Sequence, residues 1–119
     1  MRKLNRLKRS EFPLATLAFY GPTDELATKA VVSIVKKEGG EITNLNRWIT
    51  TLGDIRRDPI IGDEIAQFLK AHKVQSVVTA ERIIGCPHEE GKDYPKGTDC
   101  PRCPFWVGRD RFTGEMKKR

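Results

Sequence analysis

A chain of 119 residues has room for one hydrophobic core and little more, so we expect a single domain with at most a small appended module. A content of 38% hydrophobic and 32% charged residues, with clear apolar periodicity in the middle of the chain, argues against a largely disordered protein. The net charge of +6 is concentrated at the ends, with +5 in residues 1–9, +4 in residues 102–119 and −3 in between.

The first apolar run, Leu14–Tyr20, predicts a buried strand that ends at Gly21-Pro22. Basic residues precede this run, but it is too short for the core of a signal peptide or for a membrane span, so we expect a cytoplasmic protein. A helix is predicted next, because Thr23 or Asp24 can cap it and Gly39-Gly40 can end it. Its apolar face is formed by residues four apart, namely Leu26, Ala30 and Ile34 together with Ala27, Val31 and Val35.

Residues 41–51 predict a second strand, although they lack one clean apolar face. Asp58-Pro59 then supplies an N-cap and a proline at the first position of a second helix, which we expect to end near Lys73. Residues 77–84 predict a third strand that ends immediately before Gly85. The second helix has an apolar face of Ile61, Ile65, Phe68, Leu69 and His72, on which the histidine is expected to be a partly buried helix-end residue.

The order β-α-β-α-β predicts a small α/β domain with a mostly parallel three-stranded sheet, plus a C-terminal zinc-binding module. The expected division is a basic N-terminal arm in residues 1–11, the α/β domain in residues 12–85, and the zinc-binding module with a basic tail in residues 86–119. If the first strand is central, the loops at 21–24 and 51–57 and the segment from Gly85 share one edge of the sheet, where open α/β sheets commonly bind ligands.

Cysteine and histidine residues near the C-terminus have the spacing of a metal site. Cys86-x-His88, eleven further residues and Cys100-x-x-Cys103 supply three thiolates and one imidazole, which predicts one structural zinc ion in a closed tetrahedral site. Three cysteines cannot all pair within one chain, so metal ligation in a reducing compartment explains them better than disulfides. The alternatives are a redox pair in Cys100-Pro-Arg-Cys103 with the first cysteine merely buried, or iron, although iron clusters usually take four cysteines.

Two resemblances follow from these motifs. His88-Glu89-Glu90 with the C-P-R-C turn is similar to the H-x-E and P-C-x-x-C signature of zinc-dependent nucleoside and base deaminases, which implies proton transfer by Glu90. The sequence departs from that family because Asp99 replaces the signature proline, the motifs lie too close together, and Cys86 offers a fourth ligand that would close the site to water. The C-P-R-C turn also resembles the knuckles of zinc ribbons, and the whole tail is similar to small bacterial proteins; only the four ligands are carried over.

The charge distribution predicts a nucleic-acid or ribonucleoprotein-binding module, because each cation placed on a phosphate releases a condensed counterion. The two terminal blocks could equally be solubilising tails. Phe105, Trp106 and Phe112 alternate with arginines and could stack on bases, but we expect Phe105 and Trp106 to cover the metal site. The candidate contacts to RNA or DNA are Arg2, Lys3, Arg6, Lys8, Arg9, Arg109 and Arg111.

Two further functions remain open from the sequence. One is a small enzyme or ligand-binding domain that uses the cleft at the sheet edge; no nucleophile and base stand at a recognisable spacing, so a non-enzymatic role is favoured. Residues that could contribute to such a cleft are Asp24, Arg56, Arg57 and Glu90. The other is a protein-interaction adaptor. Thr23 is expected to cap a helix rather than to hold an anion, and no membrane partner is expected.

Overall fold

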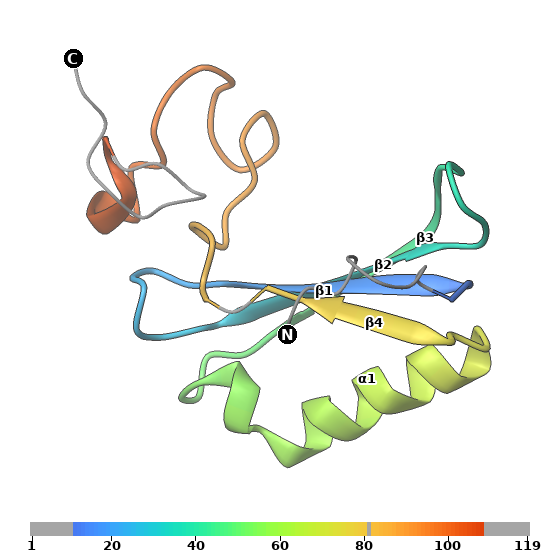
Figure 1. The fold of residues 1–119 in the computed structure, drawn as a ribbon. Coiled ribbons are helices and arrows are strands. Elements are labelled where there is room, and N and C mark those ends of the chain that lie inside the picture. The colour runs from blue at the N-terminus through green and yellow to red at the C-terminus, as the bar shows by residue number, and fades with distance from the viewer. Residues whose placement is uncertain (1–10, 81, 109–119) are drawn as a thin grey trace.

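A four-stranded mixed sheet forms the centre of the protein, seen in a computed structural model that describes residues 11–80 and 82–108 (Figure 1). Its strands are β1 (Leu14–Tyr20), β2 (Lys29–Val35), β3 (Ile42–Ile49) and β4 (Ser76–Thr79), in the spatial order β3-β2-β1-β4. β2 pairs antiparallel with both β1 and β3, and only β4 runs parallel to β1. The predicted β-α-β-α-β domain with a mostly parallel three-stranded sheet is therefore wrong.

The error lies in the segment predicted as the first helix, which is strand β2 preceded by a loop. Ala30, Val32 and Ile34 are fully buried while Val31 and Ser33 are half-buried, which is the period of two that a strand shows. Most of its residues are β-branched, and such side chains fit a pleated sheet better than a helix. Short connections then join β1, β2 and β3 as antiparallel neighbours, whereas parallel neighbours would need long crossovers.

Helix α1 (Pro59–Ala71) covers one face of the sheet and returns the chain from β3 to β4 (Figure 1). As predicted, it begins at Asp58-Pro59, where the Asp58 carboxylate accepts hydrogen bonds from the backbone N–H groups of Ile60 and Ile61. The helix places Ile65, Phe68 and Leu69 against the buried cluster of Ala15, Val32 and Ile34. The helix thus leaves the opposite face of the sheet, called the open face below, without a helical cover among the described residues.

The remaining predicted strands also exist, with different lengths. The prediction for residues 41–51 corresponds to β3, whereas the one for residues 77–84 gives a strand that already ends at Thr79. Beyond that point the chain still follows β1, because the Ala80 N–H donates to the Leu17 carbonyl and the Ile84 N–H donates to the Phe19 carbonyl. This stretch carries Gly85 and the first metal-ligand candidates to the end of β1.

The loops after β1, β3 and β4 meet at one end of the sheet. The Gly21 N–H donates to the Gly85 carbonyl at 2.9 Å, and the Ile55 N–H donates to the Ala27 carbonyl at 2.8 Å. Position 21 has to be glycine, because a Cβ there would lie 1.7 Å from the carbonyl oxygen of Leu26. The junction therefore brings the segments around residues 21–28, 54–57 and 85 together, because β1, β3 and β4 all run toward it and only β2 runs away from it.

Asp54 holds two of these loops together. Its carboxylate caps the short 3-10 turn η2 (Ile55–Arg57), accepts a hydrogen bond from the Ala27 N–H at 3.2 Å, and pairs with the guanidinium of Arg56 at 2.7 Å. The hydrogen bonds from the Arg56 side chain hold the pKa of Asp54 well below its ordinary value. A carboxyl whose folded pKa is lowered stabilises the fold above its unfolded pKa, and this contribution is lost as the pH falls.

We expect Asp54→Ala to lower the free energy of unfolding by about 1–2 kcal/mol at neutral pH, as for the loss of a helix cap. The difference between wild type and variant should shrink as the pH falls below about 4, where Asp54 begins to be protonated in the unfolded chain. Urea unfolding at several pH values measures both effects. Asp24→Ala, at an exposed aspartate of the β1–β2 loop, is the control; equal losses in the two variants would contradict the assigned role.

Candidate metal centre

Four side chains from two separate stretches form the candidate metal centre. Cys86 and His88 follow directly after Gly85, and Cys100 and Cys103 precede the 3-10 turn η3 (Pro104–Trp106). Their potential ligand atoms all lie within 4.8 Å of one another. The residues predicted from the spacing of the motifs are thus brought together, and they could hold one metal ion.

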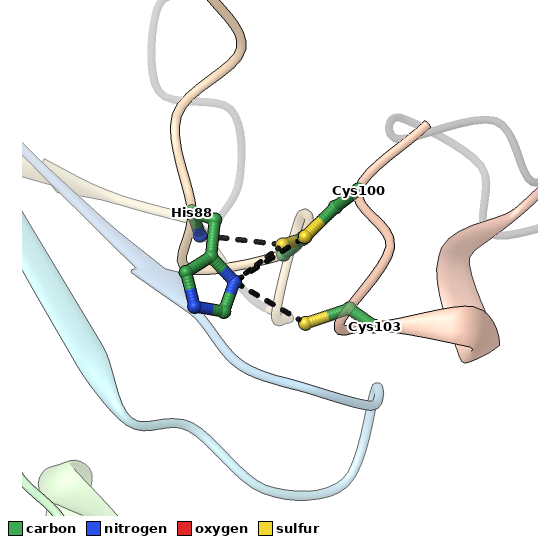
Figure 2. Close-up of side chains that lie close together, drawn as sticks. His88, Cys100 and Cys103 are labelled. Atoms are coloured by element: carbon green, nitrogen blue, oxygen red, sulfur yellow. Dashed lines mark hydrogen bonds between the residues drawn. The ribbon is translucent and has the colours of Figure 1, made fainter. Parts of the chain in front are cut away.

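The imidazole of His88 faces all three sulfurs. Its Nδ1 atom lies 3.3 Å from the Sγ atom of Cys86, 3.4 Å from that of Cys100 and 3.5 Å from that of Cys103. Figure 2 shows this nitrogen directed at the sulfurs of Cys100 and Cys103. Atoms bound at about 2.0 Å (nitrogen) and 2.3 Å (sulfur) to one tetrahedral ion lie about 3.5 Å apart, so the spacing fits a shared ion.

Burial and backbone contacts define the chemistry of the thiols. All three cysteines are free and buried, and burial raises the pKa of the Cys86 thiol to about 12 and also raises that of Cys103. The backbone N–H of His88 points at the Cys86 sulfur at 3.2 Å and can stabilise a thiolate. Because metal ligands must be deprotonated, a cation that binds here displaces the thiol protons and supplies the charge that the buried thiolates need.

A small apolar shell surrounds the four ligands. Tyr94 and Trp106 are buried with the three cysteines, and Phe105 packs against this cluster. The indole Nε1–H of Trp106 donates to the Gly21 carbonyl at 2.8 Å, which fastens the end of the segment to the loop after β1. Trp106 therefore covers the metal site, as the sequence predicted, and its polar edge has a partner inside the protein.

Glu90 does not occupy the position that deaminase-like chemistry would need. Its carboxylate accepts a hydrogen bond from the Gly97 N–H at 2.6 Å, which closes the loop between the two ligand pairs. Cys86 also offers a fourth protein ligand, so a four-coordinate ion held by all four side chains would have no place for a reactive water.

An ion cluster that the sequence analysis missed fastens the metal-ligand segment, residues 86–106, to the open face of the sheet. The ammonium of Lys29, on β2, lies 2.7 Å from Glu89 Oε2 and donates to the Pro87 carbonyl at 2.9 Å. Arg47, on β3, donates to the same carboxylate oxygen at 2.6 Å. Hydrogen bonds from Lys29 and then Arg47 lower the pKa of Glu89 to about 2, and Lys29 itself is only 5% exposed.

Two open cavities lie beside this Lys29–Glu89–Arg47 cluster. The sheet cavity, of about 380 Å³, lies over the open face and is lined by Tyr20, Val31, Ser33 and Leu45. The loop cavity, of about 570 Å³, lies at the end of the strands between the β1–β2 and β3–η2 connections and the metal-ligand segment. His88, Lys29, Arg47 and Glu89 line both, so one groove runs past the metal centre and the ion cluster crosses it.

The other residues singled out from the sequence lie in different surroundings. All seven candidate nucleic-acid contacts, Arg2, Lys3, Arg6, Lys8, Arg9, Arg109 and Arg111, lie outside the described residues, as does Phe112. Of the four proposed cleft residues, Glu90 lines the sheet cavity, Arg56 pairs with Asp54, and Asp24 and Arg57 line neither cavity. Thr23 accepts a hydrogen bond from the Glu25 N–H within a loop, and the His72 ring contacts Phe68 at the end of α1.

Within the described residues, no helix is long and apolar enough to cross a membrane. Comparisons of the chain with protein-family models, with curated proteins and with solved structures gave no match.

Proposed function

We propose that this protein is a nucleic-acid or ribonucleoprotein-binding module that a single structural zinc ion stabilises. The observation that carries the metal part is the position of His88 Nδ1, which lies 3.3–3.5 Å from each of three cysteine sulfurs. Soft thiolates and an imidazole in a compact four-ligand set favour zinc over hard cations such as magnesium or calcium. The ion's role is structural, because four protein ligands leave no open position for substrate.

The zinc ion would hold the metal-ligand segment in shape. The loop of residues 89–99 is almost entirely exposed apart from Tyr94 and is rich in charged residues, glycine and proline, so it lacks the apolar contacts that could order it alone. In modules of this kind the free energy of metal binding is free energy of folding. The ordered segment then presents its outer surface and the groove beside the Lys29–Glu89–Arg47 cluster.

Charge supports nucleic acid as the partner. The two terminal blocks, residues 1–9 and 102–119, carry +5 and +4, while the residues between them sum to −3. Cations concentrated in two blocks at the chain ends attract a phosphate backbone more strongly than the same number spread over the surface. A ribonucleoprotein partner offers the same phosphates.

The expected result is binding to RNA or DNA that weakens steeply with salt, with a log-log slope of about −0.9 per neutralised phosphate on duplex DNA and about −0.7 on single strands. Deletion of residues 1–9 should flatten this slope, because it removes five cations. Arg109→Ala with Arg111→Ala should have a smaller effect of the same kind. Fluorescence anisotropy over a salt series measures the slope; full-length protein that binds no nucleic acid at low salt would overturn the proposal.

A further inference from the structure

We propose that the loop cavity binds one unpaired nucleotide, with its phosphate near Lys92 and Arg102 and its base against Ile49. The inference rests on the proposed nucleic-acid partner and assigns it a site distinct from the terminal arms. At about 570 Å³, the cavity lies within the size range of small-molecule sites, which is about 300–1,000 Å³. A nucleotide could enter it alone or as an unpaired residue of a single strand.

The charge of the cavity favours an anion. Its lining contains four cations, Lys29, Arg47, Lys92 and Arg102, and two carboxylates, Glu89 and Asp93. Both carboxylates have internal partners, since Glu89 binds Lys29 and Arg47 and Asp93 accepts a hydrogen bond from the Glu89 N–H at 2.7 Å. Among the described residues, neither Lys92 nor Arg102 forms an ion pair. These two cations remain available to a ligand.

The charge of the metal centre has to be included in this balance. A divalent ion with three thiolates and a neutral imidazole carries a net charge of −1. Cys103 lines the cavity and Arg102 is next to it in the chain, so this arginine is partly offset by the centre. Lys92, on the exposed loop, is the cation best placed to meet a phosphate, and the lining as a whole stays positive.

The uncharged part of the lining fits the rest of a nucleotide. Ile49 ends β3 and is 66% exposed, although its side chain is apolar, and it lines the cavity together with Pro22 and Pro87. Thr28 and Thr51 add hydroxyl groups that can bind the sugar. Single strands are commonly bound by base stacking on aromatic rings together with cations along the backbone. Because no Phe, Tyr or Trp lines this cavity, the base would instead pack against the apolar wall of Ile49, with the hydroxyls and cations beside it.

A base inside this cavity cannot be paired at the same time, so the proposal predicts that single strands bind more tightly than duplexes. The test uses the full chain with its metal and fluorescein-labelled single-stranded RNA of mixed sequence, in parallel with the same sequence as a duplex. Lys92→Glu is expected to weaken binding of the single strand by about tenfold or more, because it removes a charge-assisted hydrogen bond and places a negative charge beside the phosphate. Ile49→Ala should weaken it several-fold, and Arg102→Gln less than Lys92→Glu.

Matched controls lie on helix α1, on the other side of the sheet. Lys70→Glu makes the same change of charge at an exposed lysine, and Ile60→Ala truncates an isoleucine that is likewise exposed. Both should leave the affinity for the single strand within about twofold, since they touch no part of the groove. Circular dichroism and metal content establish that each variant is folded, so a loss of binding can be assigned to the site.

The outcomes separate the groove from the arms. Equal effects of Lys92→Glu and Lys70→Glu, or of Ile49→Ala and Ile60→Ala, would overturn the groove site while leaving nucleic-acid binding by the arms intact. If mononucleotides compete with the labelled strand, a free nucleotide is sufficient to fill the cavity. If only oligonucleotides compete, the ligand is a nucleotide within a single strand. Both results support the site. Inorganic phosphate that competes as well as a mononucleotide would overturn the contact with the base. Absence of binding by any strand and any mononucleotide would overturn both proposals.

Discussion

Cys103→Ser is expected to abolish tight metal binding and to unfold residues 86–106, the largest effect of any single substitution considered for this chain. The Cys103 side chain is almost fully buried and lies 3.5 Å from His88 Nδ1. A serine hydroxyl is a poor zinc ligand and would leave the remaining thiols buried without a cation. Structural zinc in finger peptides contributes about 10–16 kcal/mol, so loss of one ligand should cost several kcal/mol.

Elemental analysis should find about one zinc per wild-type chain and far less in Cys103→Ser. Limited proteolysis should then cut the variant within residues 89–99, and a strong chelator should make the wild type equally sensitive. Glu90→Gln is the matched control: its amide oxygen can still accept the hydrogen bond from the Gly97 N–H, so metal content and protease resistance should stay unchanged. A Cys103→Ser protein with full metal content would contradict the four-ligand site.

Removal of the Glu89 carboxylate is expected to produce the second largest effect. In Glu89→Ala the ammonium of Lys29, only 5% exposed, would lose its counter-charge and keep the Pro87 carbonyl as its remaining hydrogen-bond partner among the described residues. Breaking a largely buried ion pair on one side leaves an uncompensated charge, and we expect a loss of about 2–3 kcal/mol in the free energy of unfolding. Urea denaturation at neutral pH measures this loss.

Two further variants identify the cause. Lys29→Met combined with Glu89→Ala should recover part of the lost stability, because an apolar side chain no longer needs a counter-charge at that buried position. Glu41→Ala, at an exposed glutamate between β2 and β3, should change the stability by less than about 0.5 kcal/mol. If the double variant were as unstable as Glu89→Ala, the buried charge of Lys29 would not be the source of the loss.

The sequence predicted the elements whose signals are local. Asp58-Pro59 determines the start of α1 because the cap and the proline act within one turn. The metal ligands were found for the same reason, since C-x-H and C-x-x-C are short motifs whose chemistry is recognisable without a fold. The motif spacing predicted that Cys86, His88, Cys100 and Cys103 share one ion, and the structure brings their ligand atoms to within 4.8 Å of one another.

Strand β2 shows where the sequence pattern was ambiguous. Leu26, Ala30 and Ile34 satisfy a helical spacing, while Ala30, Val32 and Ile34 satisfy the alternation of a strand equally well. A continuous apolar run fits both, and the deciding signal was the β-branched content of residues 31–35. Because this single segment determines the pairing of β1 and β3 as well, one wrong assignment changed a mixed sheet into a parallel one.

The Lys29–Glu89–Arg47 cluster could not be predicted from spacing. Lys29 and Glu89 are 60 positions apart and Arg47 and Glu89 are 42 positions apart, so only the sheet register and the placement of the metal-ligand segment bring them together. One signal was present: Lys29 stands at the start of a largely apolar stretch, residues 29–35, and a lysine there needs a partner if the stretch is a buried strand. In a surface helix the same lysine could extend into solvent, so it would need no partner inside the protein.

The contacts of Gly21 have a consequence for the order in which the chain assembles during synthesis. Strands β1, β2 and β3 form two consecutive antiparallel hairpins, so they can pair as soon as residue 49 has left the ribosome. The Gly21 carbonyl, however, accepts its hydrogen bond from the indole of Trp106, which is synthesised 85 positions later. Until then the end of β1 lacks the partners that the C-terminal segment provides. If the proposed zinc ion orders that segment, a cell short of zinc would accumulate chains that are folded at the start and open at the end, with an unfinished groove exposed to proteases.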